Sequence, residues 1–162
     1  MKKPSFLNKL KKEGKLMLVE PSEEICNSYL DKADNCLKSA KLLLQNNLYE
    51  NSVSMSYYVM YNSLTALLFR IGIKCENHAG SILVFKKLFG RIDLFKTISF
   101  AKEERIDKQY YVISRQNFIL TKESAQDMIT KAENFLVQMK LLIQSIKNKD
   151  IEKIRKNFNR IV

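Results

Sequence analysis

The chain has 162 residues, of which 46% are hydrophobic, and it contains only four glycines and two prolines. This length is enough for one domain with its own core, and so few turn-forming residues favour a helical protein over a sheet protein. Its three cysteines lack CxxC spacing, and with one histidine they are too few for a zinc site. We therefore expect no metal, no bound cofactor and a reducing, cytoplasmic location, with Cys26 and Cys36 as buried thiols.

The net charge of +11 is concentrated at the two ends of the chain. Residues 2–15 carry six lysines and Glu13, a balance of +5, and residues 147–160 carry six basic side chains with Asp150 and Glu152, a balance of +4. The first residues mix lysines with scattered apolar side chains, so no secretory leader is expected. Two polybasic ends suggest a nucleic-acid or acidic partner, and solvated termini of a lysine-rich protein explain them equally well.

Two helices and a connector are predicted before the middle of the chain. Residues 4–13 predict a short helix that ends at Gly14, followed by an extended connector over residues 15–21. Ser22 then offers an N-cap, and apolar residues recur at helical spacing for about six turns. Asn46–Asn47 breaks this amphipathic helix, and so short a link predicts an antiparallel hairpin with the helix that follows.

We expect the chain to fold around the stretch from Tyr49 to Lys74. Residues 51–69 contain no charged side chain, and polar residues interrupt the apolar ones. A membrane span would be more uniformly apolar, so no membrane association is expected. A helix without charge on any side is typical of one surrounded by other helices. Three tyrosines on it can each place a ring in the core and a hydroxyl at a partner or pocket: Tyr57, Tyr58 and Tyr61.

The next segments predict a loop, a helix and a further connection. Residues 74–78 form the expected polar loop, and the shorter helix after it closes at Gly90. Residues 91–98 predict a connection, and Ser99 is the expected cap of a highly charged helix that runs to about residue 112.

A loop over residues 114–120 and a long helix capped by Thr121 complete the prediction. The basic residues that follow either extend this helix or form a separate one, and no strand is predicted. The expected fold class is thus all-α, an up-and-down bundle of about five main helices with short helical segments at both ends. The predicted domain organisation is a basic segment over residues 1–21, a bundle over residues 22–146 and a basic helical extension over residues 147–162.

Three segments, in this order, resemble parts of one known family. The first is YLDKADNCLKSAKLLLQNNLYENSVSMSYYVMYNSLTALL, the second is GIKCENHAGSILVFKKLF, and the third is ERIDKQYYV followed by TKESAQDMITKAENFL. They are similar to the opening hairpin, the loop with the third helix, and the fourth and fifth helices of HEPN domains. The resemblance covers Tyr29 to Leu136 and is closest to small single-domain prokaryotic members.

This resemblance implies a helical bundle that pairs as a homodimer through its central helices. It also implies RNA or nucleotide binding, and a minimal nucleotidyltransferase as the partner in a toxin–antitoxin or defence pair. Many catalytic members are metal-independent ribonucleases in which a histidine follows an arginine by four to six residues. An interaction module without nucleotide chemistry is the alternative function, and an endoribonuclease is the second alternative.

The arginine–histidine motif is altered in this chain. Arg105 matches the arginine by position, but Tyr110 and Tyr111 stand five and six residues later. A phenol with a pKa of about 10 is a poor general base at neutral pH compared with an imidazole. The resemblance therefore predicts a binding site at this position more strongly than it predicts ribonuclease activity.

Arg105 and His78 are the candidate catalytic residues and, with Lys74, the expected phosphate-binding residues. A guanidinium holds phosphate with two parallel hydrogen bonds. His78 stands at a helix start, where unpaired backbone amides favour an anion. The alternatives are a surface network with Glu104 and Asp107 for Arg105, and a helix cap or a bond to a carbonyl for His78.

Four further residues complete the predicted nucleotide site. Lys108 lies one turn after Arg105 on the same helix face, although a surface ion pair would explain it as well. A cleft between the central helix and the helix of Arg105 would allow a tyrosine to stack on a base, and the candidates are Tyr58, Tyr61 and Tyr111. Packing in the core or in a dimer interface is the alternative for these rings.

Overall fold

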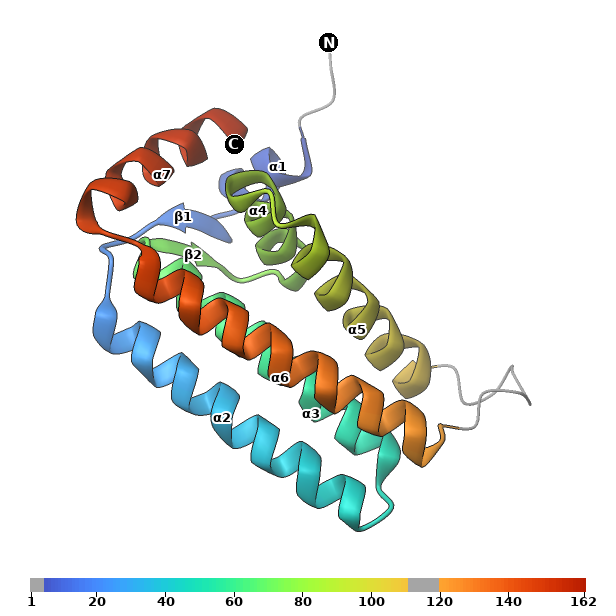
Figure 1. Cartoon of the computed structure of the whole chain (residues 1–162). Coiled ribbons are helices and arrows are strands. Elements are labelled where there is room, and N and C mark those ends of the chain that lie inside the picture. Colours follow the sequence, from blue (N-terminus) through green and yellow to red (C-terminus); the bar gives the residue numbers. More distant parts are fainter. Residues whose placement is uncertain (1–4, 111–119) are drawn as a thin grey trace.

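The structure is a computed structural model that describes the backbone of residues 5–110 and 120–162, and the side chains of these ranges apart from those of 106–110. Long helices form most of the molecule, and a two-stranded sheet lies at one end (Figure 1). The described residues confirm the predicted all-α bundle, with five helices in the middle of the chain and one more at each end. In chain order the elements are α1 (Phe6–Lys12), β1 (Leu16–Leu18), α2 (Glu23–Gln45), α3 (Tyr49–Arg70), β2 (Ile73–Cys75), α4 (His78–Phe89), α5 (Ile92–Tyr110), α6 (Lys122–Ser145) and α7 (Asn148–Ile161).

Helices α2 and α3 form the predicted antiparallel hairpin. Ser22 caps α2, and its Oγ accepts a hydrogen bond from the Ile25 amide at 3.1 Å. The link between the helices turns at Asn47, whose φ of 60° lies in the left-handed region that asparagine tolerates. Ser52 Oγ of α3 donates to the Ala40 carbonyl of α2 at 2.8 Å, so a small hydroxyl joins the two helices at close range.

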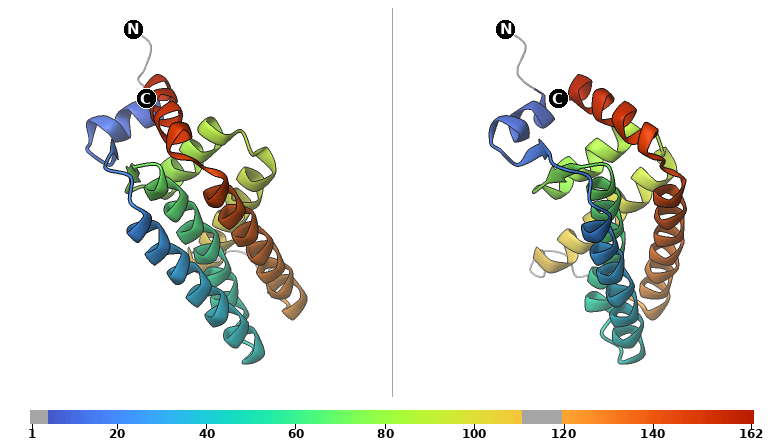
Figure 2. Two further views of the ribbon diagram at one scale, coloured as in Figure 1. Left: turned by 60° about the vertical axis from the view of Figure 1, so that its left-hand side comes forward. Right: turned by 90° about the vertical axis from the view of Figure 1, so that its left-hand side faces the viewer.

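Helix α3 lies at the centre of the bundle, as its uncharged sequence predicted. Helices α2, α4, α5 and α6 all contact it, and the two turned views place it among them (Figure 2). More than half of its 22 residues are buried. Four of these are serines whose hydroxyls are small enough to lie between helices: Ser52, Ser54, Ser56 and Ser63.

The absence of strands was predicted wrongly. Leu16–Leu18 pairs antiparallel with Ile73–Cys75, so that Met17 stands opposite Lys74. Each strand has only three residues, too few for an alternating pattern to stand out in the sequence. The pairing replaces part of the expected connector and part of the expected polar loop.

The prediction of a connection over residues 91–98 was also wrong. Helix α5 begins at Ile92 and continues unbroken to Tyr110. Leu94, Ile98 and Ala101 are buried at helical spacing, which draws the first turns of α5 onto the core. Ser99 therefore lies inside the helix and does not cap it.

The last two helices are separate. Thr121 caps α6 through a reciprocal pair of bonds with Ser124, as predicted. The chain then turns at Ile146, and α7 begins at Asn148. The loop predicted over residues 114–120 lies outside the described residues, apart from Leu120.

Both flanking segments pack against the bundle. Leu7 and Leu10 of α1 are buried, and so are Ile151 and Phe158 of α7. Helices α1 and α7 each contact α4, and all views show them at the same end of the molecule (Figures 1 and 2). The domain boundaries proposed from the charge pattern stay a prediction.

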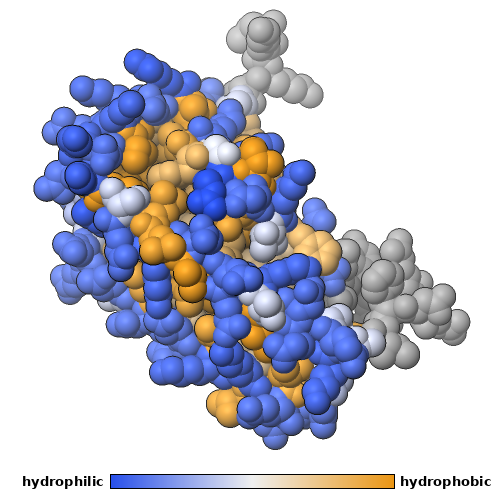
Figure 3. Space-filling view, in the orientation of Figure 1, coloured by the Kyte–Doolittle hydropathy of each residue, from blue (hydrophilic) through white to orange (hydrophobic). Residues whose placement is uncertain are grey.

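Hydrophilic side chains cover much of the face that carries α2 and α6, with apolar side chains scattered between them (Figure 3). Within the part of the chain that is described, no helix combines the length and the hydrophobicity that a membrane crossing needs. The same residues contain no cluster of three side chains suited to a metal ion. The cysteines are unpaired, and Cys26 is buried as predicted, whereas Cys36 is only half-buried.

Candidate functional site

Arg105 and His78, which are far apart in the sequence, meet at the tyrosines of α3. Asn77 caps α4, because its Oδ1 accepts a hydrogen bond from the Gly80 amide at 2.8 Å. This cap places His78 in the first turn of α4, and Arg105 reaches the same region from α5. Tyr57 lies between them and contacts both side chains.

His78 is held by two tyrosines. Its Nδ1 lies 2.6 Å from the hydroxyl oxygen of Tyr57, a short hydrogen bond. Its ring also stacks on Tyr61, with the ring centroids 3.7 Å apart and the planes 15° apart. Since Tyr57 occupies Nδ1, Nε2 is the ring nitrogen that remains for a ligand.

Arg105 contacts the two tyrosines that lie next to each other on α3. Its Nη1 donates a hydrogen bond to the hydroxyl of Tyr58 at 3.1 Å. Its guanidinium carbon lies 5.3 Å from the ring centre of Tyr57 and 5.2 Å from that of Tyr58, within the range of cation–π attraction. The Nε of Arg105 is buried and has no hydrogen-bond partner among the described residues.

Burial and neighbouring charges keep these groups in defined protonation states. Burial lowers the pKa of His78 below its usual 6.5, and the positive charges of Arg105 and Lys102 lower it further. The imidazole is therefore neutral at pH 7. Burial also raises the pKa of the Tyr57 and Tyr61 hydroxyls, so both remain protonated phenols that can donate a hydrogen bond.

The structure brings together four of the predicted site residues: Arg105, His78, Tyr58 and Tyr61. We call these four side chains and Tyr57 the Arg–His cluster. His78 does not cap its helix, since Asn77 does so.

Of the other predicted site residues, Lys74 alone has a described side chain. Lys74 lies on β2, where its ammonium forms an ion pair of 2.6 Å with Glu76, and no described contact joins it to the Arg–His cluster. The side chain of Lys108 and the whole of Tyr111 lie outside the described residues.

Tyr57 was missed as a site residue. The sequence places it beside Tyr58 and one turn before Tyr61, which signals an aromatic surface but does not distinguish the three rings. Tyr57 is fully buried, as core packing predicted, and its hydroxyl nevertheless bonds the histidine. One side chain thus serves both the core and the site.

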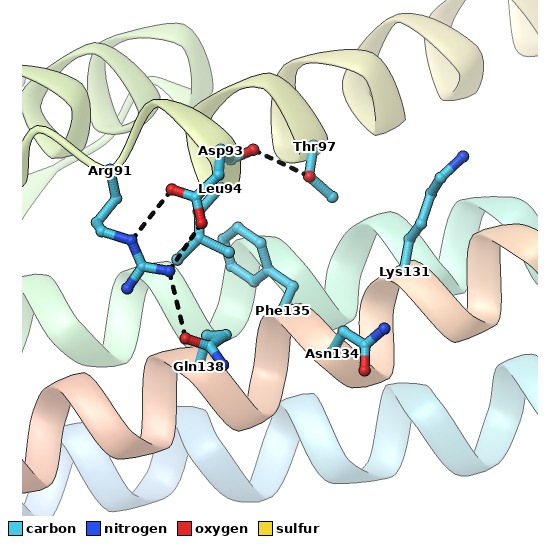
Figure 4. Close-up of a pocket in the computed structure, with 8 residues that line it drawn as sticks. All are labelled: Arg91, Asp93, Leu94, Thr97, Lys131, Asn134, Phe135 and Gln138. Carbon is cyan, nitrogen blue, oxygen red and sulfur yellow. Dashed lines mark hydrogen bonds and ion pairs between the residues drawn. The ribbon is translucent and has the colours of Figure 1, made fainter.

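A separate hollow of about 380 Å³ lies between the start of α5 and α6 (Figure 4). Arg91 at its edge bonds both carboxylate oxygens of Asp93, at 3.1 and 2.8 Å, and Gln138 at 3.3 Å. Lys131, on the opposite wall, is paired with Asp127 at 2.5 Å. Because carboxylates already neutralise both cations, the hollow is not suited to an anion.

Comparisons with known proteins agree with this architecture. A family model described as the HEPN domain matches residues 26–142, which include the whole Arg–His cluster. The "UPF0332 protein" of Thermotoga maritima is 30% identical over 130 residues, which are 77% of this chain and 96% of that protein.

Two proteins of Methanocaldococcus jannaschii are also similar. "Putative toxin MJ0605" is 28% identical over 143 residues, 82% of this chain and 98% of its own length. "Putative toxin MJ0142" is 28% identical over 116 residues, 68% of this chain and 76% of its own length. Since the family model covers well over half of the residues, the chain belongs to the HEPN domain family.

Proposed function

We propose that this protein binds RNA through phosphate contacts of the Arg–His cluster, and that it is the toxin-like half of a pair with a minimal nucleotidyltransferase. The observation that carries the proposal is the convergence of Arg105 and His78 on Tyr57, at 5.3 Å from its ring centre and 2.6 Å from its hydroxyl. A guanidinium and an imidazole side by side are a suitable pair of donors for one phosphate group.

The protonation states support this role. A neutral His78 with Nδ1 engaged by Tyr57 offers Nε2 to a phosphate oxygen as a donor, or to a hydroxyl as an acceptor, depending on its tautomer. The half-buried ring of Tyr58 lies beside the guanidinium and offers a face on which a base can stack. Arg105 contributes the positive charge, and the rings of Tyr57 and Tyr58 shield part of its guanidinium from water, which strengthens its attraction to a phosphate.

Toxin-like behaviour is supported by family membership and by the two relatives whose names include the word toxin. Induced expression of the wild-type chain is expected to arrest growth of a bacterial host, and co-expression of a nucleotidyltransferase encoded beside it is expected to restore growth. Co-purification of the two proteins tests the partnership. Growth that continues at full expression would contradict the toxin role.

RNA binding is tested by titrating labelled single-stranded RNA with wild-type protein and Arg105→Ala at several salt concentrations. The variant is expected to lose about 10- to 100-fold in affinity, since it lacks one charge-assisted contact. The slope of log affinity against log salt concentration is expected to become shallower by about 0.7, the value for one lost phosphate contact on a single strand. Arg91→Ala is the matched control, because Arg91 stands at the opposite end of α5 and is bonded to Asp93. Equal binding by wild-type protein and Arg105→Ala would favour an interaction module without nucleotide chemistry.

A second candidate is a metal-independent endoribonuclease. It is favoured by the lowered pKa of His78 next to Arg105, because a neutral imidazole can act as a general base at neutral pH. In this arrangement the histidine comes from α4 in place of the altered position after Arg105. Cleavage of a generic transcript in the presence of a chelator, lost in His78→Ala, would support it, and intact RNA would leave binding as the function.

A further inference from the structure

Four cations form one line along the exposed side of α7. Lys149, Lys153, Lys156 and Arg160 follow at intervals of four, three and four residues, so they share one helix face with one charge per turn. All four side chains are exposed, and no ion pair joins any of them to another described residue. Successive charges are thus about 5.4 Å apart along the axis. We call this line the α7 stripe.

The opposite face of α7 is already covered. Ile151 and Phe158 are buried in the core, and Ile154 packs against it. The α7 stripe therefore points away from the bundle, whereas its apolar counterpart has no surface left for a membrane or a partner helix. Of the two acidic residues in α7, Asp150 is engaged at the helix start, where it accepts from the Lys147 amide at 2.9 Å.

Arg155 fixes the orientation of this helix. Its Nη1 donates to the carbonyl oxygens of Val19 at 2.7 Å, Gly72 at 2.8 Å and Ile71 at 3.3 Å. These carbonyls belong to the chain before α2 and to the turn after α3, so one guanidinium ties α7 to the end of the central hairpin. Because Arg155 and the buried Phe158 both anchor α7 to the bundle, the α7 stripe faces a fixed direction.

Helix α1 adds cations at the same end of the molecule. Lys9, Lys11 and Lys12 are exposed, and both views of Figure 2 show α1 beside the C-terminal end of α7. The two basic segments, which stand at opposite ends of the sequence, therefore combine at one pole. Both lie outside residues 26–142, which the HEPN family model matches.

The chemistry of this pole favours a polyanion over a protein partner. Protein interfaces are depleted in lysine and have an apolar centre, whereas the α7 stripe is made of three lysines and an arginine with no apolar residue among them. A line of equal charges at regular spacing suits the repeating phosphates of a nucleic-acid backbone.

We propose that the α7 stripe, extended by the lysines of α1, is a docking surface for the phosphate backbone of RNA. It would hold the strand by charge alone, apart from the Arg–His cluster, while α4 links the two sites, since α4 carries His78 and packs against α7. This proposal rests on the proposed RNA binding, but it does not require Arg105 to be the site of that binding.

The test replaces the four residues of the α7 stripe with glutamine, which retains helix propensity. Labelled single-stranded RNA is titrated at several salt concentrations with the full chain. Four lost contacts are expected to lower the salt slope by about 2.8 and the affinity at 0.15 M salt by about 100-fold. The matched control replaces four exposed lysines of α2, α5 and α6 with glutamine: Lys32, Lys38, Lys96 and Lys122. It removes the same charge and is expected to lose much less.

Each outcome bears on one site. If the stripe variant binds RNA as wild-type protein does, or loses no more than the control, the stripe proposal is wrong. If the stripe variant is weakened while Arg105→Ala is not, the stripe proposal holds and the role of Arg105 fails. Vesicles with anionic lipid serve as a further probe, and a stripe that is needed for vesicles but not for RNA would also overturn the proposal. Thermal unfolding at the wild-type temperature shows that the variants are folded.

Discussion

Tyr57 is the residue on which the candidate site is built. Its ring is buried in the bundle, its hydroxyl bonds His78, and Arg105 lies over its face. Burial raises the pKa of this hydroxyl, so it stays a protonated partner for the imidazole at any physiological pH. Burial also keeps His78 neutral, although the hydroxyl oxygen of Tyr57 could accept a hydrogen bond from a charged imidazolium ring as well. One enclosed phenol thus couples the packing of α3 to the chemistry of α4 and α5.

The pKa of His78 is expected to lie below 6.5 and to depend on the charge of Arg105. Because the chain has one histidine, the NMR signals of its ring protons report the titration of His78 alone. Arg105→Ala removes a repulsive positive charge and is expected to raise this pKa, whereas Arg105→Lys retains the charge and changes it less. An unchanged pKa in Arg105→Ala would show that the two groups are not electrostatically coupled.

The lowered pKa of His78 also predicts how stability depends on pH. The unfolded chain binds this proton near pH 6.5 and the folded chain binds it only at lower pH. The free energy of unfolding is therefore expected to fall as the pH drops from about 6.5 to the folded-state pKa. Denaturant unfolding of wild-type protein and His78→Gln between pH 7.5 and 5.5 measures it. If the free energy of unfolding fell with pH as steeply in His78→Gln as in wild-type protein, the lowered pKa would not belong to His78.

At the scale of elements, the sequence predicted best those helices whose ends and faces are encoded locally. Ser22 and Thr121 cap α2 and α6, and both helices carry a long apolar stripe. The strands depend instead on tertiary burial, because Leu16 is fully buried in a three-residue segment that shows no local pattern. The start of α5 does carry a helical spacing in Leu94, Ile98 and Ala101, which only the buried face of the folded helix makes plain. The meeting of Arg105 with His78 is likewise a product of packing, and only the family resemblance pointed to both.

Gly72 is expected to be essential for the seating of α7. It has a φ of +71°, and a Cβ there would overlap Arg155 Nη1 and the carbonyl oxygen of Val19. Gly90 is the matched control, since its φ is +64° and its surroundings are open. Gly90→Ala is expected to cost about 1 kcal/mol for the left-handed conformation alone.

Gly72→Ala is expected to cost about 3 kcal/mol, because the clash adds to the same conformational cost. Denaturant unfolding of the two variants gives the difference directly. Equal losses would mean that α7 is not held against the Gly72 turn as the geometry implies.

At the scale of the whole molecule, α3 is covered on most sides by its own chain. A half-buried edge remains on it, where Met55, Tyr58 and Asn62 recur at helical spacing. This edge includes the tyrosine bonded to Arg105. We propose that the homodimer implied by the family resemblance forms through this edge, which would bring two Arg–His clusters close to one interface.

The dimer is tested by measuring the molar mass in solution. One chain has a mass of 18.9 kDa, and the wild-type protein is expected to show twice that molar mass, as a dimer does. Met55→Arg places a charge in the proposed interface and is expected to yield monomers. Leu141→Arg is the control, because Leu141 is an exposed apolar residue on α6. A monomeric wild-type protein, or a Met55→Arg variant that still dimerises, would contradict the proposed interface.

The central claim, that Arg105 and His78 act on RNA as one site, is tested most directly by a double-mutant cycle. RNA affinity is measured for wild-type protein, Arg105→Ala, His78→Phe and the double variant, since phenylalanine retains the stacking on Tyr61 but removes both nitrogens. Groups that hold one phosphate together are expected to show a coupling free energy above about 0.5 kcal/mol, so the double variant loses less than the two single losses combined. Losses that add within about 0.3 kcal/mol, as expected for Arg105→Ala combined with Lys38→Ala, would contradict the claim.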